Sequence, residues 1–252
     1  YQEVKIMKKA GGILAEVLGK VLAEVKPGVS ELELDALAEK LIRERGGEPG
    51  FMKVPGYKHT ICVATNDIVV HGIPTERKLQ EGDVVGIDCG VFLDGFHSDM
   101  AQTIKVQSVK RKVQNDSEDE VDKFLRIGEE AMWAGIHQVK AGNRVGHISQ
   151  AIQQVIEPAG YSVVRDLIGH GVGRDLHEEP EIPGYLSKKI ERTPLLKENM
   201  TIAVEVIYNM GKPEVVYANK DGWTISTADG KLSGVFERTV VVTKKGYEIL
   251  TA

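Results

Sequence analysis

Residues 84–103 read VVGIDCGVFLDGFHSDMAQT, and this stretch decides the fold. Two runs rich in β-branched and aromatic residues flank Asp94-Gly95, a dipeptide that favours a two-residue hairpin turn. With the turn at that point, Asp88 of the first run faces Ala101 of the second. Asp99 is then the diagonal neighbour of Asp88 on the same face, about 7–8 Å away between Cα atoms. The stretch therefore predicts an antiparallel hairpin that brings two carboxylates together.

Two further acids stand in apolar runs where a strand should be buried. Glu205 lies within TIAVEVI, and Glu237 lies within VFERTVV. Taken singly, each could be an edge-strand acid or half of a salt bridge, and Arg238 is the obvious partner for Glu237. With Asp88 and Asp99 they make four acids in apolar strands, without a matching supply of buried basic residues. Buried carboxylates repel one another unless a proton or a cation is shared among them, so the pattern indicates a cation site.

Outward from the hairpin, a pair of helices occurs twice along the chain. Apolar residues at helical spacing predict a helix over residues 3–24. A second helix starts at Ser30, where Glu33 completes a capping box. The second pair has its first helix over residues 120–138, and its second helix ends at Gly160.

The two helix pairs share one spacing along the chain. Equivalent positions are Val25 and Val139, Gly28 and Gly142, Leu34 and Ile148, Leu41 and Val155, Ile42 and Ile156, and Gly46 and Gly160. We interpret this coincidence as an internal duplication, with halves of about 1–119 and 120–252. The alternative is that any two amphipathic helix pairs look alike.

Each helix pair is followed by runs of strand-forming residues separated by turn residues. These runs are 60–64, 83–93 and 96–106 in the first half, and 161–165, 200–209, 223–227 and 234–243 in the second. Paired helices followed by hairpins predict an α+β protein, with helices packed on one face of a mainly antiparallel sheet. We expect a single domain over residues 1–252.

Composition narrows the classes of partner. The net charge is −5 and the pI about 5.9, so no basic excess favours nucleic acid or an anionic membrane. No apolar run approaches the roughly 20 residues of a membrane span, and the N-terminus does not resemble a signal peptide. Cys62 and Cys89 do not suggest a disulfide scaffold. We expect a cytoplasmic protein with small or peptidic partners, and a solvated surface excursion over residues 107–120.

Three of the seven histidines have contexts that favour a functional role. His170 lies in GHGVG, where glycines let the backbone pack closely and leave the imidazole free. His71 precedes a Gly-Ile-Pro turn, and His177 follows the glycine loop. The others, His59, His97, His137 and His147, have no such context and are expected to be structural or at the surface.

Four carboxylates and one imidazole form a hard, oxygen-rich donor set. Such a set suits a pair of divalent first-row ions such as Mn, Fe, Co or Zn better than a structural zinc site, which favours cysteine. Bridging carboxylates suit two ions about 3.5–4 Å apart. A site of this kind ionises a water and polarises a carbonyl oxygen, so the sequence favours hydrolysis.

With these residues in view, the sequence resembles a known family. Its five proposed ligands occur in the order and approximate spacing of the metal ligands of pita-bread metallopeptidases: Asp88, Asp99, His170, Glu205 and Glu237. The segments VHGIP (70–74), GHGVG (169–173), HEEP (177–180) and DGWT (221–224) are similar to those of type I methionine aminopeptidases. The resemblance covers essentially the whole chain, and the combination is specific although any one motif would be weak. It implies two pseudo-symmetric halves, and metal-dependent removal of the N-terminal methionine from nascent polypeptides.

The resemblance also implies roles for the site residues. The five ligands would hold two divalent ions (Co, Mn, Fe, Zn or Ni), with Asp99 and Glu237 contacting both. Glu205 would double as general base for a water that bridges the ions. His177 would contact the scissile carbonyl and stabilise the tetrahedral oxyanion, and His71 would bind substrate or the leaving nitrogen.

The same resemblance implies a methionine side-chain pocket. Its lining would be Phe51, Tyr57, Cys62 and Trp223, which makes physical sense because thioethers pack well against aromatic rings. Ordinary core packing is the alternative reading of these four residues. We further expect a monomer that meets its substrates near the ribosome.

Three positions depart from the family pattern. Val206 follows Glu205 where the family usually has proline, and Arg238 follows Glu237 where type I enzymes commonly have histidine. Leu176 stands where an aromatic residue often closes the pocket. The departures bear on the strand after Glu205, on the surroundings of Glu237 and on the tightness of the pocket.

Two alternatives stay open beside methionine removal. A proline-specific aminopeptidase or dipeptidase would share the fold and ligands, and the segments 98–103 and 173–177 lean toward those relatives. They usually carry a separate N-terminal domain, whereas the first helix of the catalytic fold begins here at the third residue. A non-catalytic peptide-binding relative would typically have lost ligands, and all five remain.

Overall fold

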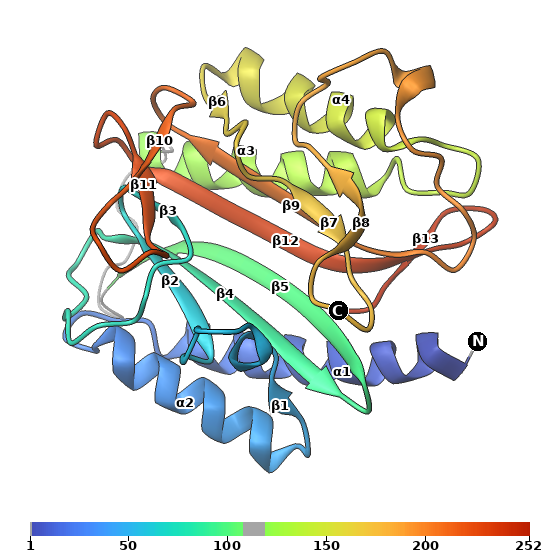
Figure 1. The fold of residues 1–252 in the computed structure, drawn as a ribbon. Coiled ribbons are helices and arrows are strands. Elements are labelled where there is room, and N and C mark those ends of the chain that lie inside the picture. Colours follow the sequence, from blue (N-terminus) through green and yellow to red (C-terminus); the bar gives the residue numbers. More distant parts are fainter. Residues whose placement is uncertain (1, 108–118) are drawn as a thin grey trace.

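The computed structural model describes residues 2–107 and 119–252. Its helices lie against one long twisted sheet, and a smaller sheet stands at one end (Figure 1). The helices are α1 (Gln2–Ala23), α2 (Glu31–Glu44), α3 (Glu120–Ile136) and α4 (Val145–Ile156), with short 3-10 turns η1 (Phe51–Lys53), η2 (Glu157–Ala159) and η3 (Ile190–Arg192). No helix in these two ranges is long and apolar enough to cross a membrane. Most of the polar stretch predicted as a surface excursion lies outside the described residues.

The long sheet has the strand order β1-β4-β5-β12-β9-β7-β8, with β2, β6 and β13 attached beside it. Its strands are β1 (Glu48–Pro49), β2 (Ile61–Thr65), β4 (Val84–Leu93), β5 (Phe96–Lys105), β6 (Ser162–Val163), β7 (Gly169–Gly171), β8 (Glu178–Ile182), β9 (Thr201–Asn209), β12 (Ser233–Val242) and β13 (Tyr247–Ile249). The small sheet has the order β10-β11-β3, from β3 (Ile68–Val70), β10 (Val215–Tyr217) and β11 (Ile225–Thr227). Every pairing described is antiparallel, as the α+β prediction requires.

The predicted hairpin is confirmed. Strands β4 and β5 pair around Asp94-Gly95, and Asp88 lies opposite Ala101. The two turn residues have φ angles of 49° and 86°. Positive φ at both central positions is the requirement of the tight turn that twists with its strands, and Asp-Gly meets that requirement at low cost.

Alternation along the strands separates a helix face from an open face. On β4 and β5, Ile87 and Met100 belong to the core that α1 and α2 cover. On β9 and β12, Val204 and Phe236 belong to the core under α3 and α4. Successive residues of a strand point to opposite faces, so the residues between these apolar positions face away from all four helices.

The two helix pairs share details of their ends, as the repeated spacing predicted. Ser30 starts α2 with the predicted capping box, in which Ser30 Oγ accepts from Glu33 N at 3.2 Å and Glu33 Oε2 accepts from Ser30 N at 2.6 Å. Gly28 and Gly142 follow the first helix of each pair and have φ of 92° and 93°. Each helix pair covers one half of the sheet, so the described chain has two pseudo-symmetric halves (Figure 1).

The strand predictions were wrong in detail at two places. The run predicted over 223–227 forms a strand only from Ile225, because Asp221 accepts hydrogen bonds from the main-chain N of Trp223 and Thr224, both at 2.8 Å, and holds them in a turn. Strands β7 and β8 were not predicted, because the first is rich in glycine and the second is mostly polar.

Candidate metal centre and active site

One row of register partners crosses five strands on the open face of the long sheet. From β2 to β9 it contains Cys62, Asp88, Ala101, Glu237 and Glu205. Directly opposed residues of neighbouring strands point to the same side, so three carboxylates line up across the sheet. Ala101 stands between them with only a methyl group, which leaves room beside the acids.

Asp99 and His170 complete this group from neighbouring strands. Asp99 precedes Ala101 by two residues on β5 and therefore shares its face. His170 Nε2 lies 3.9 Å from Asp99 Oδ2 and 3.9 Å from Glu237 Oε1. One ligand atom from each of these three side chains lies within 4.8 Å of the others. The structure therefore brings together all five residues that the sequence suggested as ligands.

The His170 imidazole is oriented to offer a lone pair. Its Nδ1 lies 2.8 Å from Gly171 O, a carbonyl that can only accept, so Nδ1 carries the proton and Nε2 is free to coordinate. Burial lowers the pKa of His170 to about 4, and the neighbouring His177 lowers it further. A neutral ring with its second nitrogen held by a carbonyl is the usual state of a metal-binding histidine.

The four carboxylates are buried together without enough positive charge. Burial raises the pKa of Asp88 to about 7, although hydrogen bonding to Asp99 opposes this rise. Burial, and then the neighbouring acids, raise the pKa values of Asp99, Glu205 and Glu237 well above their usual range. No lysine or arginine within residues 2–107 and 119–252 is buried.

The donor set therefore fits divalent cations. Within the described chain, Asp88 Oδ1 is buried without a hydrogen-bond partner. A buried anionic oxygen without a partner is costly, and the four acids together cannot all ionise unless cations neutralise them. Carboxylate oxygens and one imidazole are the ligands that divalent first-row ions accept.

Arg238 does not supply the missing charge, which corrects the salt bridge expected with Glu237. Its Nη1 donates to the main-chain O of Glu237 at 2.7 Å and of Ala101 at 3.1 Å, and its Nη2 donates to Gln102 Oε1 at 2.7 Å. The guanidinium thus lies on the helix face, across the sheet from the Glu237 carboxylate. Val206, the other departure beside a ligand, is fully buried within an unbroken β9.

An apolar pocket of about 290 Å³ opens onto the carboxylates. All four residues expected for the methionine pocket line it: Phe51, Tyr57, Cys62 and Trp223. The Tyr57 ring lies 5.1 Å from the Trp223 ring and 6.4 Å from the Phe51 ring, both edge to face. Tyr57 Oη donates to Ile61 O at 2.8 Å and accepts from Cys62 Sγ at 3.2 Å. The aromatic wall is therefore fixed in orientation.

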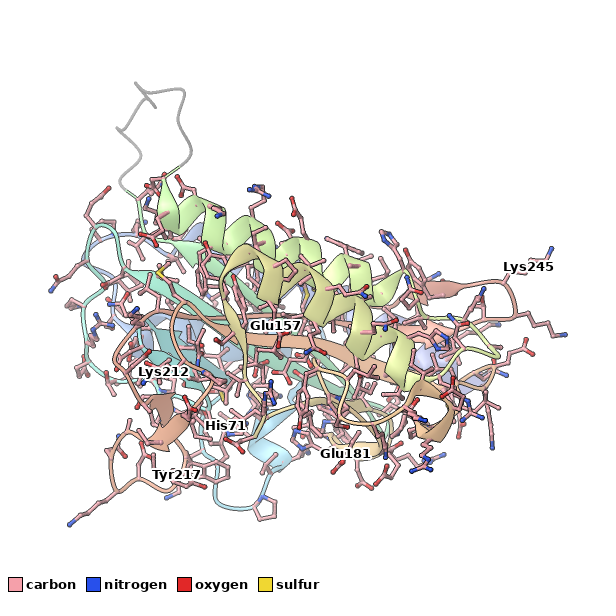
Figure 2. The ribbon with its side chains drawn as sticks, turned by 90° about the horizontal axis from the view of Figure 1, so that it is seen from above. His71, Glu157, Glu181, Lys212, Tyr217 and Lys245 are labelled. Atoms are coloured by element: carbon pink, nitrogen blue, oxygen red, sulfur yellow. The ribbon has the colours of Figure 1, made fainter. Side chains whose placement is uncertain are left out.

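His71 and His177 line the same pocket. The rings of His170 and His177 are 4.4 Å apart, and burial lowers the pKa values of both His71 and His177. His71 has a φ of 56°, a region that non-glycine residues seldom occupy and that clusters at functional sites. In Figure 2 it lies on the same side of the molecule as Lys212 and Tyr217 of the small sheet, since it directly follows β3.

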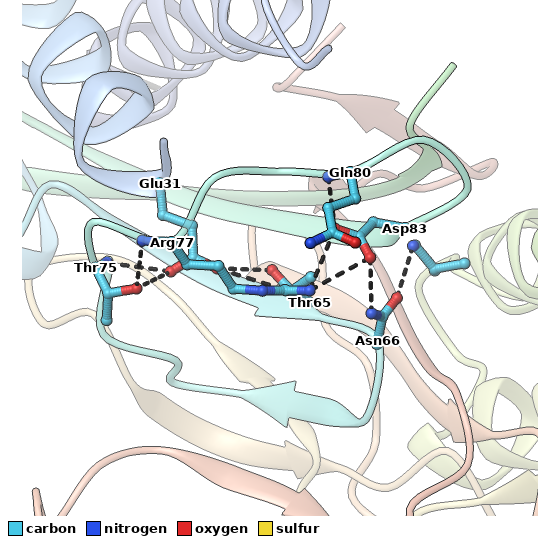
Figure 3. A network of polar contacts seen from close by, with 8 residues as sticks. Glu31, Thr65, Asn66, Thr75, Arg77, Gln80 and Asp83 are labelled. Atoms are coloured by element: carbon cyan, nitrogen blue, oxygen red, sulfur yellow. Dashed lines mark hydrogen bonds and ion pairs between the residues drawn. The ribbon is translucent and has the colours of Figure 1, made fainter. Parts of the chain in front are cut away.

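A polar network ties the segment after His71 to α2 (Figure 3). Glu31 accepts from Thr65 Oγ1 at 2.8 Å, and from the N and Oγ1 of Thr75 at 3.1 and 2.8 Å. Arg77 Nη2 pairs with Asp83 Oδ2 at 3.2 Å. These groups satisfy one another, so the network positions the chain that leads away from His71 and is not itself a ligand site.

The sequence did not single out some residues of the pocket. They are Val54, Val70, Asp166, Leu167, Ile168 and Ile207, and Leu176 was noted only as a departure. Residues 166–168 lie in the connection between β6 and β7, where no hydrophobic period marks a function. Register could have found Ile207, which lies two residues beyond Glu205 on the same face.

A metal-dependent hydrolase is the class of protein that such buried, uncompensated acids define when they meet an apolar pocket and two imidazoles. The sequence pattern of metallopeptidase family M24 matches residues 5–244. The methionine aminopeptidase of Clostridium perfringens is 43% identical over 249 residues, which cover 99% of this chain and 96% of that one. Methionine aminopeptidase 1 of Bacillus subtilis is 40% identical with the same coverage.

Solved structures agree with this match. The crystal structure of methionine aminopeptidase from Rickettsia prowazekii superposes with a TM-score of 0.92 at 35% identity, covering 100% of this chain and 97% of that one. The chain belongs to metallopeptidase family M24 and, within it, to the methionine aminopeptidases. Its fold is the pita-bread fold that the resemblance implied.

Proposed function

We propose that the chain hydrolyses the peptide bond after an N-terminal methionine, and that residues 1–252 act as one catalytic domain with halves of about 1–119 and 120–252. The observation that carries the proposal is the row of carboxylates at the mouth of an aromatic pocket. The family supports peptidase chemistry that depends on divalent metal. The pocket accounts for the choice of side chain, since it offers aromatic edges and a thiol to a thioether.

The five clustered residues would hold two divalent ions, whose identity among Co, Mn, Fe, Zn and Ni depends on supply: Asp88, Asp99, His170, Glu205 and Glu237. Such ions, when bound, polarise the scissile carbonyl and lower the pKa of a water. We assign to Glu205 the general base that takes the proton of the attacking water, because it is a buried carboxylate whose pKa is raised toward the working pH.

The two pocket histidines would act on the substrate through their N–H groups. Both are neutral at pH 7 because burial lowers their pKa values. We assign to His177 a hydrogen bond to the oxygen of the scissile carbonyl, where negative charge develops. We assign to His71 a contact with the substrate or the leaving nitrogen, at the opposite side of the pocket mouth.

Two other readings remain distinguishable by assay. A proline-specific peptidase would use the same acids, but the relatives that are 40% or more identical over nearly the whole chain carry the methionine aminopeptidase name. A non-catalytic peptide-binding protein would not need the uncompensated acids. The natural substrates would be N-termini of nascent polypeptides, met by a monomer in the cytoplasm near the ribosome, with no nucleic acid bound.

The test is release of free methionine from Met-Ala-Ser and Met-Pro-Ala after chelation and after return of Mn, Fe, Co or Zn. Xaa-Pro peptides and a peptide beginning with leucine serve as controls. Metal-dependent cleavage of only the methionyl peptides is the expected result. Cleavage of Xaa-Pro peptides instead would place the chain with the proline-specific enzymes, and peptide binding without any cleavage would support the non-catalytic reading.

A further inference from the structure

The two halves of the long sheet meet at the junction of β5 and β12, where the backbone ladder is short. The register there has two pairs, Glu237 with Ala101 and Arg238 with Met100. By contrast, β4 and β5 pair along ten residues each. The junction therefore depends on groups other than a continuous main-chain ladder, although both ionisable members of its pairs lie beside the proposed metal site.

On each side of this short ladder a threonine hydroxyl stands in for the missing main-chain bonds. Thr239 Oγ1 accepts from Asp99 N at 3.0 Å and donates to Asp99 O at 2.8 Å. Thr103 Oγ1 accepts from Val235 N at 2.9 Å and donates to Val235 O at 2.7 Å. One hydroxyl thereby satisfies both main-chain groups of the residue opposite, which uses its single hydrogen and one lone pair.

The two threonines occupy equivalent places in the two halves. Thr103 lies two residues beyond Ala101 on β5, and Thr239 lies two residues beyond Glu237 on β12, around the register pair that Ala101 and Glu237 form. Their exposed fractions are 2% and 0%, so water does not replace their hydrogen bonds. They differ in what they hold, because Thr239 holds Asp99 whereas Thr103 holds an apolar valine.

We propose that the Thr239 hydroxyl is a positioning group for the metal site, which fixes the main chain of Asp99 relative to Glu237 and thereby sets the affinity for divalent metal. The proposal rests on the function proposed above. Asp99 Oδ1 accepts from Met100 N at 3.1 Å, so the carboxylate moves with the backbone that Thr239 holds. Without the hydroxyl, the buried N–H and C=O of Asp99 lose their partner, and β5 must shift against β12 to satisfy them.

A shift at this junction would separate ligands that belong to different strands. Asp99 comes from β5, Glu237 from β12 and His170 from β7, and their ligand atoms already lie within 4.8 Å of one another. Metal sites tolerate displacements of only about 0.5 Å before affinity falls. Partners that orient ligands from outside the coordination sphere typically change metal affinity by about 10–100-fold when removed.

The equivalent threonines supply a matched pair of variants, Thr239→Val and Thr103→Val. Valine has nearly the shape of threonine without the hydroxyl, so neither variant opens a cavity, and each leaves one buried N–H and one C=O unpaired. The measurements are the dissociation constant of Mn²⁺ for the metal-stripped full chain by calorimetry, and the thermal midpoint of the metal-free protein. We expect similar losses of midpoint in the two variants. We expect Mn²⁺ binding to weaken about 10–100-fold in Thr239→Val only.

Further variants separate failure of this inference from failure of the proposed function. Thr239→Ser keeps the hydroxyl and should restore most of the affinity, and Thr239→Cys, which keeps a weak donor of similar size, should give an intermediate value if Thr239→Val does not fold. Equal Mn²⁺ affinity in Thr239→Val and Thr103→Val, whether weakened or not, would overturn the inference. Asp99→Asn tests the metal site itself, since wild-type Mn²⁺ affinity in that variant would refute the site and leave Thr239 without a role.

Discussion

Glu205 on β9 and Glu237 on β12 are direct register partners, and both carboxylates face the pocket. Burial raises the pKa of each, and Glu205 adds to the rise at Glu237. Like charges directly opposite on neighbouring strands destabilise a sheet. The fold keeps them there without a buried lysine or arginine in the described chain, so this pair is the clearest sign that the sheet is built around a cation.

Glu205→Gln should leave the fold intact and lower kcat for Met-Ala-Ser by at least about 100-fold, because the proton acceptor and a ligand charge disappear together. The thermal midpoint of the metal-free variant should not fall, since one member of a repelling pair is removed. Circular dichroism and methionine release are the measurements. Near-normal turnover would show that another group takes the proton.

Asp221→Ala should raise KM for methionyl peptides about fivefold, or about 1 kcal/mol, with a smaller change in kcat. Asp221 holds the pocket residue Trp223 by accepting from its main-chain N, and from the N and Oγ1 of Thr224. Hydrogen bonds of this kind lower the pKa of Asp221 to about 2 against the effect of burial.

The control for that variant is Asp229→Ala. Asp229 accepts from the main-chain N of Lys212 and Lys231 in a similar turn, but it does not line the pocket. An equal rise of KM in both variants would mean that the effect reflects loosening of the small sheet and not the position of Trp223.

Arg238→Met should destabilise the protein by about 1–3 kcal/mol in urea unfolding, because two main-chain carbonyls and the Gln102 amide lose a charged donor beneath the helices. Arg43→Met is the control, since Arg43 forms an exposed pair with Glu39 and its loss should cost less than about 0.5 kcal/mol. Equal effects would show that Arg238 contributes no more than a surface residue.

The metal-free protein should lose stability as the pH rises from 6.5 to 8. Asp88 has a pKa of about 7 in the folded protein, and burial also raises the pKa values of the three other acids. An acid whose pKa is higher in the folded state binds more protons there, so its contribution is present at low pH and is lost as the pH rises through the folded value. The site histidines act in the opposite direction, but only below about 6.5, their unfolded pKa.

Thermal midpoints of the metal-free protein across that pH window measure this effect. Asp88→Asn removes one of the titrating groups and should flatten the slope, and saturating Mn²⁺ should do the same for the wild type. A midpoint that is constant or rises with pH in the metal-free wild type would contradict the raised pKa values.

The hairpin and its acids could be predicted because each rests on a short-range rule. Asp-Gly fixes the turn, the turn fixes the register, and alternation then places Asp88 and Asp99 on one face. The same alternation should have warned against the pairing of Glu237 with Arg238, since neighbours in a strand point to opposite faces. That prediction was wrong because charge was considered without the strand period.

Other parts of the site had no local signal. The hydroxyls of Thr103 and Thr239 act only because β5 and β12, more than a hundred residues apart in the chain, diverge on both sides of one register pair. The positive φ of His71 and the lining by residues 166–168 likewise depend on how separate segments meet. Long-range register, which a single sequence does not encode by pattern, decides each of them.

The short junction between β5 and β12 gives the proposed metal ions a mechanical meaning. Two of the five ligands come from the first half and three from the second: Asp88 and Asp99, then His170, Glu205 and Glu237. A cation held by both sets works as a non-covalent cross-link across the line where the backbone ladder is thinnest. Chelation would therefore unfasten the molecule along its middle, and neither half could keep the ion after separation from the other.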